Sequence, residues 1–258
     1  MFGFAEMNID WRLVDEDSKL PLHTREWLEH QHISWAQNRT FPPRTYGSTA
    51  LFSINKAAHR VTSKGQDETG LGRWCWTKYQ GRGGHALRII IAYRPNPPGG
   101  PYTVYAQQNT YFQSIKKNIC PRTSFLIDLE VEIKSFISEG DHIILLIDSN
   151  SNMKRSDIQG ILHQLTLREA IMEWHGYHGP ETFRRNNARN PIDGIWTTPG
   201  ISISRGGYFQ HDEVFLNTDH RCLWVDISYE QAFSHNMPTL FKPKARKLNC
   251  RDPRLVNN

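Results

Sequence analysis

The sequence predicts an α/β protein in which helices cover mixed β-sheets, and three observations support this fold class. An amphipathic helix pattern at 122–138 is followed at once by a buried strand pattern at 143–147. An alternating segment at 73–79 and a more apolar one at 87–92 flank a glycine-rich turn, which is typical of a β-hairpin. Short strand and turn patterns return after Thr182. Helices packed on sheets bury both kinds of apolar face.

The other elements are predicted in order along the chain. The segment around Glu6 is otherwise apolar, which indicates a short buried strand at the start. Thr24 can cap a helix whose apolar face holds Trp27, Leu28 and Trp35. Further predictions are a strand at 49–54 and helices at 104–117 and 157–174.

The bulk composition narrows the class of protein. The chain has 258 residues, a formal net charge of +5 and a pI of about 9.0, a balance that suits a polyanionic partner without proving one. Its four cysteines show no paired spacing, so we expect reduced thiols in an intracellular protein, nuclear or cytoplasmic and not secreted. No apolar run approaches the roughly 20 residues of a membrane span, so we expect no membrane partner.

We expect one domain over residues 1–228, because strand and helix patterns continue to that point. Residues 229–258 are rich in lysine, arginine and proline and have little apolar periodicity. They are predicted to form a basic tail or linker toward a further domain.

Acidic residues lie at the ends of three apolar runs, at Asp148, Asp193 and Asp219. Carboxylates at strand ends can converge on one pocket and hold a divalent cation. In an extended segment Asp148 and Asn150 point the same way, so one can accept a proton from water while the other donates to a phosphate oxygen. The alternative for Asp148 is an Asx turn that closes the strand, and Asp193 can equally be a turn residue.

Four further polar residues fit the same chemistry. His220 can donate to a phosphate, especially if a carboxylate such as Asp193 holds its other ring nitrogen. Glu6 lies inside an apolar strand and needs a partner, for which a metal ion is one choice and water at a sheet edge another. Tyr93 and Asn96 can donate to phosphate oxygens, or simply end a strand.

Basic residues flank the Asp193 segment, at Arg184, Arg185 and Arg189. They can contact a nucleic-acid backbone, although a solvated basic face is the alternative for any one of them. Offsetting phosphate charge and activating a water are what phosphodiester hydrolysis requires. The residues therefore favour a phosphodiester-cleaving site.

Taken in order, these segments resemble the endonuclease/exonuclease/phosphatase superfamily, which includes deoxyribonuclease I and the exonuclease III-type abasic-site endonucleases. The resemblance covers residues 1 to about 228, and the order of the motifs carries it. The motifs are Glu6 in a strand, Tyr93-Arg94-Pro95-Asn96, Asp148-Ser149-Asn150, Asp193, and Thr218-Asp219-His220.

The resemblance implies a four-layer α/β sandwich of two packed mixed sheets flanked by helices, with the site at the top of the sheets. It implies Mg²⁺ or Mn²⁺ bound by Glu6 with help from Asp219, and DNA as the substrate. The remaining roles it implies are water activation by Asp148, phosphate binding by Asn150 and His220, orientation of His220 by Asp193, and support of the phosphate by Tyr93 and Asn96.

Residues 70–74, 92–95 and 244–254 look like the version of this family found beside reverse transcriptases in mobile elements, which implies a reverse transcriptase domain as a partner. Two departures from the family stand out. The family's first strand, which carries an Asn and would pair beside 223–227, is missing here, and Ile147 replaces the usual Gly before the Asp-x-Asn motif. The chain is therefore expected to be a fragment or a decayed copy.

The leading hypothesis is a divalent-metal-dependent endonuclease that acts on DNA. Two alternatives stay open. One is a phosphatase or phosphodiesterase acting on a small phosphate ester. The other is a catalytically weak domain that binds nucleic acid or a partner.

Overall fold

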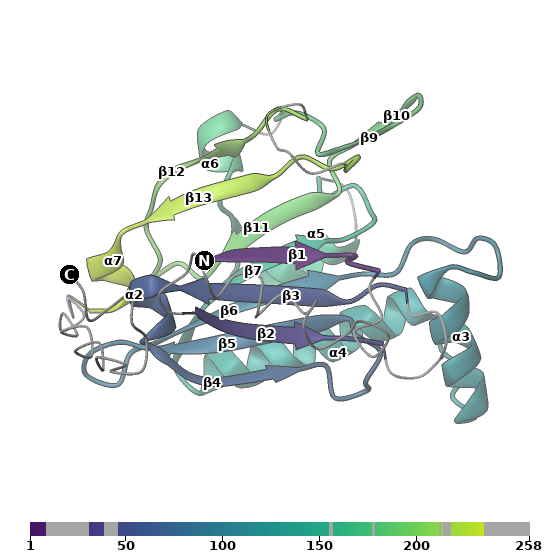
Figure 1. Ribbon diagram of the computed structural model, residues 1–258, viewed down its shortest axis with the longest axis horizontal. Helices are drawn as coiled ribbons and strands as arrows, with labels where there is room; N and C mark the ends of the chain where they lie inside the picture. Colours follow the sequence, from purple (N-terminus) through teal and green to yellow (C-terminus); the bar gives the residue numbers. More distant parts are fainter. Residues whose placement is uncertain are drawn as a thin grey trace, which may run out of the picture.

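The computed structural model describes residues 1–8, 31–38, 46–154, 157–176, 179–211, 213 and 218–234. Figure 1 shows two packed layers of strands with long helices on one side. The central sheet has six strands in the order β4-β5-β6-β7-β11-β8. Their bounds are β4 (Val61–Gln66), β5 (Trp74–Gln80), β6 (Ala86–Tyr93), β7 (Asp141–Asp148), β11 (Asp193–Thr197) and β8 (Arg168–Glu169).

Three neighbouring strands in the middle of this sheet bring three predicted site residues together at one end of the strands. Every residue of β6 is buried, as expected for a central apolar strand. β6 pairs in parallel with β7, which places Tyr93 beside Asp148. β11 pairs with β7 in the antiparallel sense, which places Asp193 beside Asp148 on the other side. The register alone therefore aligns these three side chains.

Helices fill the crossover between the two parallel strands and cover one face of the central sheet. The helices in the described part of the chain are α2 (Asn55–Ala58), α3 (Val104–Ser114), α4 (Pro121–Ser138), α5 (Asp157–Gln164), α6 (Met172–His175) and α7 (Tyr229–Ala232). Phe125, Leu129 and Ile133 of α4 form a core with Ile143 and Leu145 of β7. Among the described residues, none of the helices is both long and apolar enough to cross a bilayer.

A second layer of strands covers the opposite face. It contains the three-stranded sheet β1-β3-β2 and the pair β12-β13. Their bounds are β1 (Phe2–Ala5), β2 (Gln31–Ala36), β3 (Thr49–Ile54), β12 (Ile203–Tyr208) and β13 (Leu223–Ile227). A Cβ at Gly3 would lie 3.1 Å from Ile91 Cδ1 and 3.3 Å from Leu146 Cδ1, so this glycine lets β1 lie close against the central sheet.

The structure confirms most of the predicted elements, including the strand at 49–54, the hairpin and the long helix after residue 120. Trp35 was predicted on a helix face and this is wrong, because it lies in β2 and pairs with Ala50. The segment 157–174 is not one helix. Thr166 adopts φ 61°, which ends α5, and the buried Glu169 carboxylate then accepts the N–H of Ile171 to begin α6.

The predicted first helix and the predicted basic tail fall largely on residues that the structure does not describe. Thr24, Trp27 and Leu28 of the predicted first helix lie outside the described residues, as does most of the predicted basic tail. The packed part reaches beyond the expected boundary at 228, because α7 follows β13 and Phe233 is buried in the core.

A buried ion pair joins the segment between β4 and β5 of the central sheet to α4. Arg73 donates to both carboxylate oxygens of Asp67 at 2.8 Å, and it also contacts Asp128 of α4 at 2.8 Å. The Asp67 and Arg73 side chains are 1% and 0% exposed. Burial alone raises the pKa of Asp67, but the hydrogen bonds and charge of Arg73 bring it below its ordinary value of 3.8.

We expect Asp67→Asn to lower the free energy of unfolding by about 3 kcal/mol at pH 7, near the low end for breaking a buried pair because Arg73 keeps Asp128. A lowered carboxylate pKa stabilises the fold above pH 3.8 and loses that contribution as pH falls through the folded pKa. Urea unfolding at pH 7 and in acid measures both effects. Glu130→Gln, which removes only the surface pair with Lys134, is the control, and equal loss in both variants would contradict the assignment.

Candidate active site

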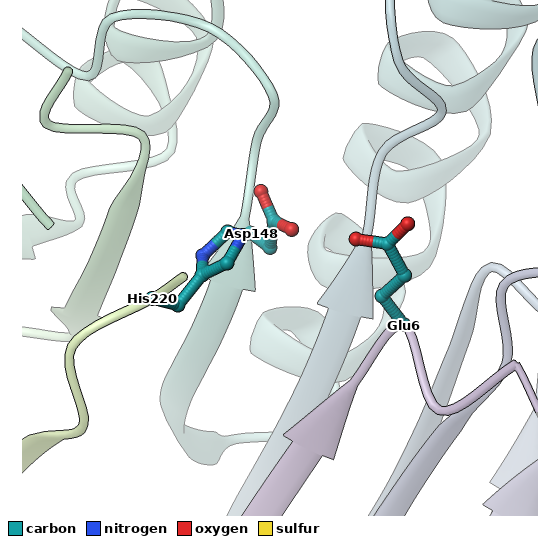
Figure 2. A group of neighbouring side chains, drawn as sticks. All are labelled: Glu6, Asp148 and His220. Carbon is teal, nitrogen blue, oxygen red and sulfur yellow. The ribbon is translucent and has the colours of Figure 1, made fainter. Parts of the chain in front are cut away.

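Three side chains from distant parts of the chain converge at one end of the two strand layers. Glu6 follows β1, Asp148 ends β7 and His220 lies three residues before β13. Figure 2 shows their polar ends turned toward one another. Each offers one ligand atom, and these atoms all lie within 4.8 Å of one another. The arrangement can hold a small cation or an anionic group between carboxylate and imidazole.

Asp148 lies deepest in the group. It is 4% exposed, and its Oδ1 accepts the backbone N–H of Asn150 at 3.0 Å. Burial, followed by the nearby charge of Asp193, raises the pKa of the Asp148 carboxyl above its ordinary value. A buried carboxylate in this setting gains most from a positive charge or a proton. Asp148 can therefore serve as a metal ligand or as a proton acceptor.

His220 is held by a carboxylate. Its Nδ1 lies 2.9 Å and 3.1 Å from the two oxygens of Asp193. Burial lowers the pKa of His220, but the hydrogen bond and charge of Asp193 outweigh it and raise the pKa to about 9. A protonated imidazole has no lone pair for a metal and donates from both nitrogens. The His220 cation is therefore better suited to an anionic phosphate than to metal ligation.

The backbone around Thr182 fixes the His220–Asp193 pair. Thr182 Oγ1 accepts the N–H of Ile192 at 2.9 Å and of Asp193 at 3.0 Å. Its carbonyl accepts the N–H of Arg221 at 2.7 Å. One threonine thus links the segments on which the two side chains stand.

Glu6 and Asn150 share an unusual backbone conformation. Glu6 has φ 53° and Asn150 has φ 45°, both in the left-handed region. Asparagine tolerates this region, whereas it costs a glutamate about 1 kcal/mol or more. Strain of this kind gathers at functional sites, and here both residues follow a strand and face the same cluster.

The Asn150 side chain is oriented by the neighbouring strand end. Its Nδ2 donates to the Arg94 carbonyl at 2.8 Å, and the same side chain also contacts the Tyr93 hydroxyl. The Tyr93 hydroxyl donates to Asn96 Oδ1 at 2.8 Å. Burial, with the charges of Glu6 and Asp148, raises the pKa of Tyr93, so the phenol remains a neutral donor.

Asp219 stands beside this cluster, outside the group of three. Its Oδ1 lies 3.9 Å from His220 Nε2, and its side chain is 40% exposed. Its carbonyl accepts the N–H of Arg184 at 2.8 Å. Asp219 therefore faces the imidazole nitrogen that is not held by Asp193.

The predicted basic residues lie on the hairpin of β9 (Phe183–Arg185) and β10 (Ala188–Asn190), which projects from the body in Figure 1. Arg184, Arg185 and Arg189 are all exposed. Arg184 pairs directly opposite Arg189, and the carboxylate of Glu181, 4.0 Å from Arg189, partly offsets these like charges. Arg185 also lines the groove that contains Glu6, Asp148 and His220.

No protein-family model and no curated protein sequence matches the chain. Solved structures do resemble it. The 3′ phosphatase NExo from Neisseria, bound to a product DNA hairpin, has a TM-score of 0.61 at 12% identity, covering 88% of each chain. An AP endonuclease from Archaeoglobus fulgidus has a TM-score of 0.59 at 13% identity, covering 87% of each chain. An endonuclease/exonuclease/phosphatase family protein from Leptotrichia buccalis has a TM-score of 0.52 at 11% identity, covering 88% of this chain and 86% of that one.

The chain has the endonuclease/exonuclease/phosphatase fold. The predicted α/β sandwich with packed sheets is thereby confirmed. In this chain the endonuclease/exonuclease/phosphatase fold brings the predicted residues Glu6, Asp148 and His220 together and leaves Arg184 outside their groove.

Two arginines that support this site have no assigned role in the sequence prediction. Arg94 donates to both carboxylate oxygens of Asp157, at 3.0 Å and 2.8 Å. Arg122 of α4 donates to the Asn150 carbonyl at 3.1 Å and to the Ser151 hydroxyl. Both hold the loop after β7. Arg94 lies within the motif Tyr93-Arg94-Pro95-Asn96, so the sequence pointed to its neighbourhood. Nothing near Arg122 in the sequence indicates its contact with this loop.

Proposed function

We propose that the protein is a divalent-metal-dependent phosphodiesterase, and specifically an endonuclease that cleaves DNA by water attack. The observation that carries this proposal is the meeting of Glu6, Asp148 and an Asp193-held His220 within one groove. Solved structures with this fold include a DNA-bound 3′ phosphatase and an AP endonuclease, which supports the same chemistry.

The donor set fits Mg²⁺ or Mn²⁺. These ions prefer carboxylate oxygens and keep several waters, and Glu6 supplies a half-buried carboxylate close to the buried Asp148. We assign Glu6 as the main ligand, with Asp219 nearby as a helper. When bound, the ion would offset negative charge on the phosphate and stabilise the leaving oxygen.

The geometry supports the remaining proposed roles. Asp148 accepts or directs the proton of the attacking water, while an oxygen–phosphorus bond forms and the bond to the leaving oxygen breaks. Asn150 and the His220 cation donate to non-bridging phosphate oxygens, and Asp193 keeps His220 charged and oriented. Tyr93 holds Asn96, so these two support phosphate binding as a pair.

A DNA substrate is favoured over a small ester by the basic hairpin. Arg184 and Arg185 are exposed beside the groove and can contact backbone phosphates on either side of the cleaved bond. We expect Arg184→Ala with Arg185→Ala to weaken DNA binding about 10-fold and to reduce the slope of binding against salt by about two phosphate contacts. Binding titrations at several salt concentrations test this. Lys134→Ala, which removes one exposed positive charge from the outer helix, is the control, and equal salt slopes in all proteins would contradict the role.

We also propose that the protein works within a mobile element. Residues 70–74 and 92–95, together with the basic 244–254 segment, support a chain that works beside a reverse transcriptase domain. A DNA end produced by nicking is a suitable primer for such a domain.

The deciding experiment is nicking of supercoiled plasmid. We expect nicked circles with Mg²⁺ or Mn²⁺ and complete loss of nicking with a chelator, restored by adding the ion back. Cleavage of p-nitrophenyl phosphate esters without nicking would favour the small-ester phosphodiesterase. DNA binding without either reaction would favour the catalytically weak binding domain.

A further inference from the structure

A short antiparallel ribbon joins the basic hairpin to the segment that carries His220. Phe183 forms a β-bridge with His220, and the two rings lie 5.1 Å apart. Backbone hydrogen bonds from the N–H groups of Arg184 and Arg221 flank this bridge, at 2.8 Å and 2.7 Å. Because side chains alternate between the two faces of a strand, Arg184 and Arg221 belong to the face turned away from the His220 ring. We call this the back face of the ribbon.

His211, three residues after β12, joins the two arginines on the back face. Arg221 Nη1 donates to Gln210 Oε1 at 2.9 Å, which brings the residue next to His211 into contact with this arginine. Burial, followed by the charges of Arg221 and Arg184, lowers the pKa of His211. Arg221 also borders the catalytic groove, whereas Arg184 and His211 do not. Three basic side chains therefore gather beside the groove, behind His220.

Two nitrogen atoms of this group are enclosed and have no hydrogen-bond partner. They are Nε of Arg221 and Nε2 of His211, and both side chains are half-buried. A guanidinium always carries a hydrogen on Nε, and a neutral imidazole can carry its hydrogen on Nε2. An enclosed donor without an acceptor is unfavourable. A ligand that brings several acceptor oxygens would satisfy both atoms, and the exposed Arg184 marks the open side of the group.

Glu181 is the carboxylate that partly offsets the charge of this group. It lies 4.0 Å from Arg189, which pairs opposite Arg184 on the hairpin. A hydrogen bond from its own backbone N–H, together with the charges of Arg221 and Arg189, outweighs burial and lowers the pKa of the Glu181 carboxyl. Among the described residues that these contacts bring together, one carboxylate thus faces three arginines. The group keeps a surplus of positive charge.

We propose that Arg184, Arg221 and His211 form a second phosphate-binding site, on the back face of the ribbon and beside the catalytic groove. A phosphate group presents several acceptor oxygens and up to two negative charges in a small volume, which matches the unpartnered donors and the surplus charge. A backbone phosphate of DNA and free phosphate offer this same chemistry. The site needs neither a metal ion nor catalysis, so it does not depend on the proposed function.

Magnetic resonance of the histidine ring nitrogens in the full chain, with a chelator present, tests the proposal. We expect inorganic phosphate to shift the Nε2 signal of His211 saturably, with a dissociation constant on the order of 1 mM. The signal is assigned by its loss in His211→Gln. Sodium chloride at the same ionic strength is the control for screening of charge.

A DNA oligonucleotide without terminal phosphates distinguishes the two sources of phosphate. Saturation of the His211 signal by this probe, at a concentration about 10-fold or more below that of inorganic phosphate, would support the site and identify the DNA backbone as its ligand. A saturable shift with inorganic phosphate alone would support the site and identify free phosphate.

Three variants separate this site from the catalytic groove. Arg221→Met should weaken phosphate binding about 10-fold or more, while Arg205→Met, exposed toward the far end of β12, leaves it unchanged. Glu181→Gln should tighten binding about threefold, because it removes a competing charge. His220→Ala should keep the His211 response, even if phosphate no longer binds in the groove.

The outcomes that would overturn the proposal are equally specific. One is the absence of a saturable His211 shift at about 20 mM phosphate, and another is an equal shift with sodium chloride. Loss of the response in His220→Ala would place the ion in the catalytic groove instead. If Arg221→Met fails to fold, Glu181→Gln still decides, since unchanged or weaker binding in that variant would contradict the site.

Discussion

Asp148→Asn is expected to reduce plasmid nicking by about 10³-fold or more while leaving the fold intact. The amide keeps the size of the side chain and still accepts the Asn150 N–H, but it cannot accept a proton or offer a charged oxygen to a metal. Single-turnover nicking rates at saturating Mg²⁺ measure the loss.

Thermal unfolding provides the matching stability control for Asp148. Burial and the charge of Asp193 make the native carboxylate costly, so the variant should melt at the same temperature or higher without metal. A nicking rate within threefold of wild type, in a protein that melts normally, would refute the role of Asp148.

His220→Ala is expected to lower turnover by about 10²- to 10⁴-fold, because it removes the charged group that we propose as a donor to the phosphate. His85→Ala is the control, since His85 lies just before β6, at the opposite end of the strand from the site. Asp193→Asn should give an intermediate loss, because it keeps the ring in place and removes the charge that raises the His220 pKa to about 9. Unchanged nicking by His220→Ala would count against the proposed function.

Much of the fold was predictable because strong periodic patterns decide it. The apolar faces of α4 and the buried run of β7 have the spacing of a helix followed by a strand, and no tertiary contact overrides them. Short patterns were less informative. Trp35 fits a helix face and a strand equally well over a few residues, and pairing with β3 decided the outcome. Neither the left-handed Thr166 that ends α5 nor the Glu169 carboxylate that accepts the Ile171 N–H leaves a sign in the local pattern.

The candidate site was predictable where its residues lie at strand ends. Asp148 and Asp193 each end or begin an apolar run, so sheet geometry brings them together. The residues that hold these side chains in place could not be predicted from strand ends. Arg122 reaches the Asn150 carbonyl from a helix 28 positions earlier in the chain, a contact that depends on how helix and sheet pack.

The threonine between the projecting hairpin and the histidine–aspartate pair has a consequence for engineering. Thr182 precedes β9, and it accepts the N–H of Asp193 and the N–H of Arg221, the residue after His220. The proposed DNA contacts of the hairpin and the alignment of His220 therefore depend on the same residue. Grafting a different hairpin to change target preference would also disturb turnover. A redesigned protein would need to keep Thr182 and its hydrogen bonds, and to exchange only the hairpin residues beyond it.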